Sequence, residues 1–181
     1  MLGFTKENAR IALDTAKEAI GIYEAKFGEY PYRQMTVAET DFFCGGMEYP
    51  NLVLIDNSLY EDESKMVLEY VIAHEVGHHL QNLAGTSAKM QAARERMNER
   101  QFNALSVRVE LQADCYAGVW AKLSEQAKGW LERGDIEQAM ASAESVGDDR
   151  LQKRSQGVAV PDSFTHGSSE QRARWFRTGL D

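Results

Sequence analysis

The segment that most constrains the fold of this chain is a predicted helix that is apolar on most sides yet contains His74, Glu75 and His78. Its apolar residues are Val67, Leu68, Val71, Ile72, Ala73, Val76 and Leu80. A helix of this composition is typical of a protein core, where two imidazoles and a carboxylate are costly to bury without partners. A bound metal ion would remove that cost, so the helix predicts a metal site inside the fold.

The spacing of these polar residues indicates which metal chemistry to expect. His74 and His78 are four residues apart, so on a helix they lie on the same face and can bind one ion together. Glu75 lies beside them and can hold a metal-bound water without binding the metal itself. This division of roles is typical of zinc hydrolases. The short motif has an alternative interpretation, a helix whose two histidines are satisfied by solvent or by neighbouring carboxylates.

A second segment, Ala104–Lys128, supplies a third candidate ligand. One face of this predicted helix carries Glu110, Ala113, Asp114, Ala117 and Ala121. Small residues allow two helices to approach closely, and Gly77 does the same on the first helix. Catalytic zinc usually has three protein ligands and a water. We therefore expect Glu110 to be the third ligand and Asp114 to accept the second N–H of a ligating histidine.

Four stretches of the chain resemble the bacterial putative neutral zinc metallopeptidase family. They are Tyr70–Leu83, Leu105–Trp120, Gly134–Arg150 and Val160–Phe176, which together cover a little over a third of the sequence. The resemblance implies a zincin-type fold that binds one Zn²⁺ per chain through His74, His78 and Glu110, with Glu75 as catalytic base. The spacing of Glu110 and Asp114 is similar to that of thermolysin-like gluzincins. The chain departs from the family pattern over Thr40–Asp56.

The localisation expected from the sequence depends on the N-terminus. Members of this family often carry an N-terminal membrane anchor and a flexible linker, and a chain trimmed of that anchor would belong to a membrane-anchored or exported protein. No apolar run here approaches the roughly 20 residues that span a membrane, and Met1–Arg10 lacks the apolar core of a signal peptide. For the sequence as it stands we expect no membrane segment and a cytoplasmic location.

Composition and charge indicate the number of domains and exclude some classes of binding partner. The 181 residues are 43% hydrophobic, which favours a single domain over residues 1–181. The formal charge of −8 argues against nucleic acid and acidic membranes as partners. Glutamates interrupt the basic cluster Arg94–Arg100, so we expect a solvated helix face there. Cys44 and Cys115 are too few for a disulfide scaffold, and Cys115 is expected to act as a small buried hydrophobe.

The helical and strand signals predict an α+β fold that is mostly helical. Helices are expected over Thr5–Phe27, Asp62–Leu83, Ala88–Arg100, Ala104–Lys128, from Asp135 to about Val146, and from Ser168 to near Gly179, with capping boxes at Asp135/Gln138 and Ser168/Gln171. Strands are expected over Gln34–Thr40 and Asn51–Asp56, with a turn at Cys44–Gly46. In a zincin-like fold this small sheet borders the cleft, and Asn51–Asp56 is the candidate edge strand for an extended substrate. An ordinary strand covering the core is the alternative.

His166 is a candidate catalytic donor. It lies in the loop Pro161–Gly167, before the last predicted helix. Gluzincins place a histidine downstream of the third ligand to stabilise negative charge on the attacked carbonyl oxygen. Here Asp162 or Ser163 could orient the ring. The alternative is a loop histidine that contacts the last helix through Ser168.

Predictions also concern three other polar residues, His79, Asp148 and Asp149. His79 is expected to be partly exposed, with a pair to Glu75, one turn earlier, as the alternative. Asp148 and Asp149 follow Gly147 and are expected to end a helix or to pair with Arg150 rather than to bind a cation.

Two functions fit these residues. The first is a zinc-dependent peptidase that acts on a peptide or protein substrate, with Glu75 activating water. The second is a non-catalytic zincin-fold module that binds zinc and serves as an interaction or adaptor domain. Glu75 favours the enzyme, because a purely structural zinc site needs no base and usually fills its fourth position with protein.

Overall fold

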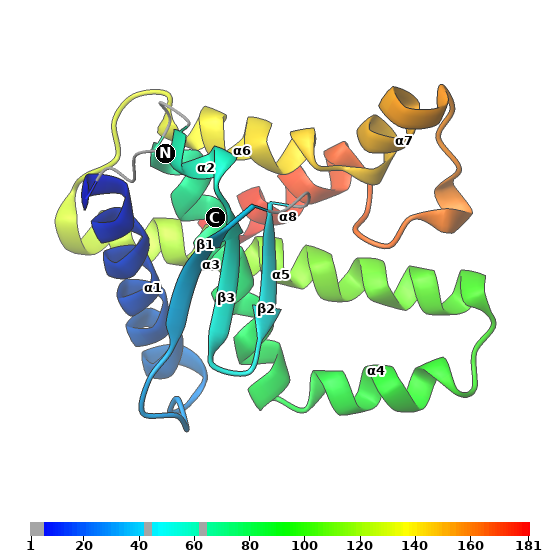
Figure 1. The fold of residues 1–181 in the computed structure, drawn as a ribbon, viewed down its shortest axis with the longest axis horizontal. Coiled ribbons are helices and arrows are strands. Elements are labelled where there is room, and N and C mark those ends of the chain that lie inside the picture. The colour runs from blue at the N-terminus through cyan, green and yellow to red at the C-terminus, as the bar shows by residue number, and fades with distance from the viewer. Residues whose placement is uncertain (1–5, 42–44, 62–64) are drawn as a thin grey trace.

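The computed structural model describes residues 6–41, 45–61 and 65–181. It is mostly helical, with one small sheet (Figure 1). In chain order the elements are α1 (Lys6–Phe27), β1 (Thr36–Thr40), β2 (Gly46–Tyr49), β3 (Leu52–Asp56), α2 (Ser58–Glu61), α3 (Lys65–Leu83), α4 (Thr86–Arg94), α5 (Glu99–Lys128), α6 (Asp135–Ser145), α7 (Asp148–Gln156), the 3₁₀ helix η1 (Pro161–Ser163) and α8 (Ser169–Leu180). The expected α+β class is confirmed. Thr5, Cys44 and Asp62, which entered the predictions above, lie outside the described residues.

The described strands form one sheet in the order β1-β3-β2. β1 runs parallel to β3, with Val37 opposite Val53, and β2 runs antiparallel to β3, with Met47 opposite Leu54. The prediction that Asn51–Asp56 forms the edge strand is therefore wrong, because β3 is central and β2 is an edge. The error arose because Gly46, which begins β2, was assigned to a turn. A strand of only four residues carries too little alternation to be recognised.

The helix α3, which carries His74, Glu75 and His78, is the buried centre of the molecule. It runs behind the sheet and packs against α1 and α5 (Figure 1). Tyr23 of α1 donates a hydrogen bond to the Ala73 carbonyl over 3.1 Å, and Val53 and Ile55 of β3 are completely buried on the other side. Polar side chains on α3 are therefore enclosed on several sides by other elements.

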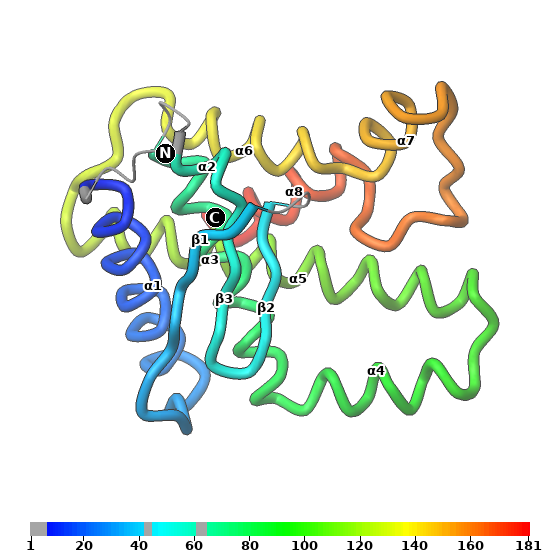
Figure 2. The backbone as a smooth tube through the Cα atoms, in the orientation of Figure 1, coloured from blue at the N-terminus to red at the C-terminus, as the bar shows by residue number. Residues whose placement is uncertain are grey.

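The helix predicted over Ala88–Arg100 differs in part from the observed structure. α4 ends at Arg94, and a turn separates it from α5, beside whose N-terminal part it lies (Figure 2). Asn98 caps α5 in a capping box with Gln101. The basic cluster Arg94–Arg100 thus spans a turn between two helices instead of forming one helix face. The sequence signal missed was Asn98, a good N-cap three residues before a glutamine.

Of the two expected capping boxes, the one at Ser168/Gln171 is confirmed at the start of α8. At α6 the N-cap residue is Gly134, with φ 102°, and no side chain caps the helix. Asp135 instead accepts a hydrogen bond from the backbone N–H of Glu132 over 2.8 Å. Among the described helices, none contains a stretch long and apolar enough to cross a membrane.

The helices α5 and α8 cross at very close range. A Cβ atom added at Gly118 would lie 2.0 Å from the Phe176 carbonyl oxygen, and one added at Gly179 would lie 2.0 Å from the Cys115 carbonyl oxygen. Neither glycine has a positive φ, so close backbone approach accounts for both. Cys115, expected to be buried, is half-buried here and has a free thiol.

We expect Gly118→Ala to destabilise the fold by about 1–3 kcal/mol, the usual cost of overpacking. The measurement is the free energy of unfolding by chemical denaturation. Gly21→Ala in α1 is the matched control, since a Cβ added there meets nothing within 4 Å. Gly21→Ala should be neutral or stabilising by up to ~1 kcal/mol. Equal stability of Gly118→Ala and wild type would contradict the close crossing.

Candidate metal centre

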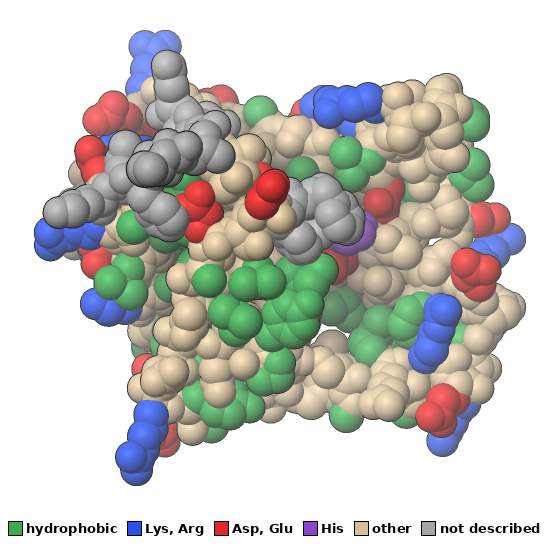
Figure 3. Space-filling model, viewed as in Figure 1, with side chains coloured by type: hydrophobic (Ala, Val, Ile, Leu, Met, Phe, Trp, Pro, Cys, Tyr) green, Lys and Arg blue, Asp and Glu red, His purple; other side chains and the backbone are tan. Residues whose placement is uncertain are grey.

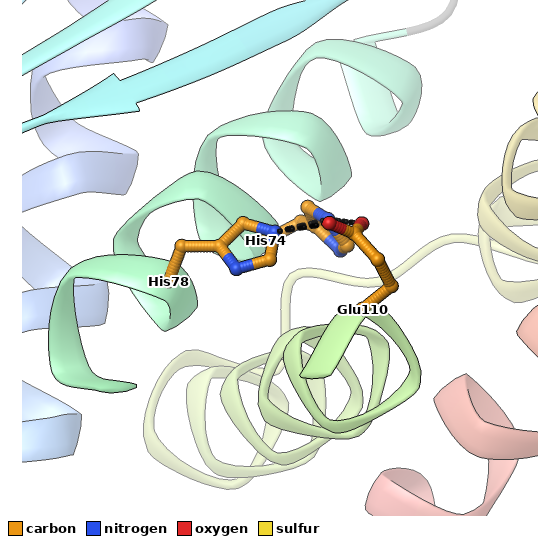
Figure 4. A group of neighbouring side chains, drawn as sticks. All are labelled: His74, His78 and Glu110. Atoms are coloured by element: carbon orange, nitrogen blue, oxygen red, sulfur yellow. Dashed lines mark hydrogen bonds and ion pairs between the residues drawn. The ribbon is translucent and has the colours of Figure 1, made fainter. Parts of the chain in front are cut away.

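Three side chains from two helices converge on one point. On α3, the Nε2 atoms of His74 and His78 lie 3.1 Å apart. Glu110 on α5 places Oε2 3.4 Å from Nε2 of His74 and Oε1 3.5 Å from Nε2 of His78. Figure 4 shows the three side chains turned toward one another. One ligand atom from each lies within 4.8 Å of those of the other two. Two imidazole nitrogens and a carboxylate oxygen are donors that zinc accepts.

The far nitrogen of each imidazole lies close to a side-chain oxygen atom. Nδ1 of His74 lies 2.8 Å from Oδ1 of Asp114, and Nδ1 of His78 lies 2.9 Å from Oε1 of Gln81. An acceptor at Nδ1 favours the tautomer whose lone pair is on Nε2, which faces Glu110. Gln81 is held in turn by the hydrogen bond that it donates to the Val109 carbonyl over 2.7 Å.

Asp114 lies where the sequence analysis expected it, whereas Gln81 was missed. A signal for Gln81 was present, since it follows His78 by three residues and so lies near it on the same helix. Its amide oxygen is the only acceptor that the described residues offer to Nδ1 of His78 by hydrogen bonding. Its role is therefore the counterpart of that of Asp114 at the other imidazole.

Asp114 is completely buried and is balanced by an arginine on α8. Arg172 donates two hydrogen bonds to its carboxylate, from Nε and from Nη2, each over 2.9 Å. Tyr70 donates a third over 2.5 Å. Burial opposes ionisation of Asp114, but the charges of Arg172 and His74 outweigh it and lower its pKa to about 2. Sequence reasoning did not find Arg172 or Tyr70.

Electrostatics at the convergence point suit a cation. Burial disfavours a charged His78, but Glu110 outweighs burial and raises the pKa of His78 to about 10. Burial likewise opposes ionisation of Glu110, and the two imidazoles hold its pKa well below the usual value. The carboxylate is thus ionised between two imidazoles. A divalent cation would take the place of the imidazole proton, so metal binding should release protons.

Glu75 lies beside this cluster and is 6% exposed. Burial raises the pKa of its carboxyl to about 7, although His74 and His78 lower it. A general base is most effective when its pKa lies near the working pH. The Glu75 carboxyl can therefore both accept and release a proton near neutral pH.

A cavity of about 330 Å³ lies over the cluster. It is lined by Gly45, Gly46, Met47, Glu48, Tyr70, Val71, His74, Glu75, His78, Glu110, Val146, Leu151, His166 and Arg172. In the space-filling view the molecule is hollowed beside the sheet, between β2 and the helices to its right (Figure 3). Three glutamates line it, Glu48, Glu75 and Glu110, and Arg172, the one arginine or lysine among its described lining residues, is paired with Asp114.

His166 lines the same cavity, but its ring is oriented by a residue that the sequence analysis had not chosen. Asp148, the first residue of α7, lies with Oδ1 3.2 Å from Nδ1 of His166. Its other oxygen accepts hydrogen bonds from the backbone N–H groups of Thr165, His166 and Gly167 over 2.8, 2.7 and 3.0 Å. Asp148 therefore holds both the ring and the loop that carries it.

The residues first expected to orient His166 have other partners. Asp162 pairs with Arg100 over 3.0 Å, and Ser163 accepts a hydrogen bond from Gln152 over 2.9 Å. Ser168 caps α8 and is not bonded to His166.

The expectation for Asp148 and Asp149 is also wrong. The two aspartates begin α7 instead of ending a helix. Asp149 accepts hydrogen bonds from the backbone and side chain of Ser169. Arg150 pairs instead with Glu144 over 2.8 Å.

His79 faces away from the cluster. It is 2% exposed, not partly exposed as expected, and it contacts the rings of Tyr30 and Tyr32 at centroid distances of 4.9 and 5.6 Å. Burial lowers its pKa. Its ring nitrogens have no hydrogen-bond partner among the described residues, so the alternative pair with Glu75 is absent from the described structure.

Comparison with known proteins agrees with the motifs. A family model described as putative neutral zinc metallopeptidase matches residues 42–181. The chain is 51% identical over 147 residues to the uncharacterized protein YpfJ of Escherichia coli strain K12, an alignment that covers 77% of this chain and 50% of that protein. It is 34% identical over 188 residues to the uncharacterized protein Mb2605 of Mycobacterium bovis, covering 98% of this chain and 59% of that protein. The chain thus spans 50% to 59% of the length of these relatives. No solved structure matches it.

Asp148→Asn should lower the pKa of His166. The hydrogen bond with Asp148 is the main cause that raises this pKa in the wild type, while burial acts in the opposite direction. The pKa can be measured by NMR titration of the imidazole proton resonances. Asp162→Asn is the control, because Asp162 pairs with Arg100 and not with His166, and it should leave the titration unchanged. An unaltered His166 titration in Asp148→Asn would contradict the assigned contact.

Proposed function

Because the chain belongs to the putative neutral zinc metallopeptidase family, we propose that it is a zinc-dependent peptidase with one zinc ion per chain. The observation that carries the proposal is the convergence of His74, His78 and Glu110 beneath an open cavity. Zinc held by these three side chains would supply Lewis acidity to a carbonyl group and to water. Among the described residues, no other histidine, cysteine, aspartate or glutamate joins the group. A three-ligand set favours a catalytic site over a structural one.

Glu75 is proposed as the general base. It lines the cavity together with the three candidate ligands, and its pKa of about 7 lets it exist as a carboxylate near neutral pH. From this place it can accept a proton from a water molecule bound beside the cluster. The same carboxyl can later return the proton to the leaving amine, which a peptidase requires at neutral pH.

His166 is proposed as a donor to the substrate carbonyl oxygen. It belongs to the same cavity, and its side chain is 51% exposed, so the ring can reach a bound molecule. Asp148 raises the pKa of the ring by hydrogen bonding, which favours the protonated, donating form. Negative charge that develops on the attacked carbonyl would be stabilised by such a donor.

The proposed substrate is an extended peptide or protein segment. β2 is an edge strand, and Gly45–Glu48 line the cavity. Edge strands bind extended peptides by adding them as a further strand. A substrate paired with β2 would pass over the candidate zinc ligands, as in a zincin-like cleft. This assigns to β2 the role that the sequence analysis gave to β3.

The purified protein should contain about one zinc per chain, and Glu110→Ala should lose it, because two imidazoles alone bind zinc weakly. Metal content is measured by mass spectrometry after dialysis. Glu99→Ala is the control, since Glu99 is an exposed residue in the first turn of the same helix, and it should keep the metal. Full zinc occupancy in Glu110→Ala would contradict the ligand assignment.

Glu75→Gln tests the peptidase directly. The substitution preserves size and removes the base, so cleavage of a proteome-derived peptide library should fall by at least ~10²-fold, while zinc content stays at the wild-type level. Equal cleavage by both proteins would refute the role of Glu75. No cleavage by zinc-loaded wild type would favour the non-catalytic binding module.

A further inference from the structure

The glycine that begins β2 has an unusual neighbour. A Cβ atom added at Gly46 would lie 2.5 Å from Oε1, 2.8 Å from Cδ and 2.8 Å from Cγ of Glu75. Real Cβ atoms essentially never come closer than 3.0 Å to another heavy atom. The space that any side chain at position 46 would need is therefore occupied by the carboxyl arm of Glu75.

Backbone conformation does not account for this glycine. Gly46 has no positive φ, whereas its neighbour Gly45 has φ 60° and would meet nothing within 4 Å if a Cβ were added. The two adjacent glycines thus have different physical causes. At Gly45 a glycine is favoured by the positive φ of the turn. At Gly46 a glycine is required because the Glu75 carboxyl occupies the space of a side chain.

The strand cannot easily move away from Glu75. Gly46 pairs with Ile55 in the register of β2 and β3. The backbone N–H of Asp56 donates to the Gly45 carbonyl over 2.8 Å. Ile55 is completely buried in the core. An added methyl group would therefore displace the flexible side chain of Glu75 sooner than the anchored strand.

We infer that Gly46 is a positioning residue, whose lack of a side chain forms the slot that holds the Glu75 carboxyl beside the candidate zinc ligands. The inference deepens the proposed function, on which the catalytic meaning of the slot rests. The slot also links the proposed substrate-binding strand β2 to the proposed base Glu75, because the backbone of β2 that would pair with a peptide lies against Glu75.

Gly46→Ala should move the carboxyl without removing a ligand. The carboxyl oxygen must move by about 0.9 Å to reach the ordinary contact distance of 3.4 Å. Crystal structures of the zinc-loaded wild type and Gly46→Ala should show the Glu75 carboxyl displaced and β2 in place. An unmoved Glu75 with a shifted strand would overturn the inference. This readout does not depend on peptidase activity, so it separates failure of the slot from failure of the proposed function.

A double-mutant cycle tests the same contact by stability and covers the case in which Gly46→Ala folds poorly. Glu75→Ala removes the arm that fills the slot, so Gly46→Ala should lower the melting temperature in the wild-type background and not in the Glu75→Ala background. The same loss in both backgrounds would overturn the inference. Gly21→Ala is the control for a harmless added methyl group.

Kinetics provide the catalytic readout. In Gly46→Ala, kcat should fall by up to ~10²-fold, the scale of losing a general base, with KM and zinc content near wild type. In the Glu75→Gln background, Gly46→Ala should cause no further loss of the residual rate, because both changes act on one carboxyl. An unchanged kcat in Gly46→Ala, or a full additional loss in Glu75→Gln, would overturn the assignment.

Discussion

The arrangement of this site depends on one buried charge, the carboxylate of Asp114. It is fully enclosed and receives two hydrogen bonds from Arg172 and one from Tyr70, while Nδ1 of His74 lies 2.8 Å from Oδ1. Such a pair is stable only when both ions are well satisfied, because desolvation is expensive. The contact joins α3, α5 and α8, so the orientation of His74 is linked to the docking of the last helix. A change at Arg172 would therefore reach the candidate metal ligands through Asp114.

Close helix packing makes this contact geometrically feasible. Ala113, Ala117 and Ala121 on α5 are completely buried, and a Cβ added at Gly77 of α3 would lie 3.5 Å from Cα of Ala113. Small residues at the crossing bring the backbones near enough for a short carboxylate to reach an imidazole on the facing helix. The glycine crossing of α5 and α8 does the same for Arg172. The polar cluster is thus enclosed by apolar surfaces that fit together at close range.

Above the polar cluster, the cavity is bordered by β2 on one side and by the segment from α6 to α8 on the other. β2 contributes backbone and the acidic Glu48, and the segment from α6 to α8 contributes Val146, Leu151 and His166. Asp148 ties the His166 loop to the start of α7 through four contacts with one carboxylate. Hydrogen bonds within the fold thus preorganise both sides, which lowers the ordering cost of binding a ligand between them.

Local sequence determined the features that depend on neighbouring residues. The helix register that places His74 and His78 together, the C-terminal ends of α3 and α5, and the capping box at Ser168 all follow from contacts within four residues, where side-chain spacing is set by helix geometry. The family could also be recognised, because its motifs are long contiguous stretches. Tertiary structure alone decided the strand order, the burial of His79 and the partners of the polar side chains. Asp148 and His166 are 18 residues apart, Asp114 and Arg172 are 58 apart, and no local rule selects one aspartate over another at that separation. The pairing depends on how the helices pack, and packing reflects the shapes of many side chains at once.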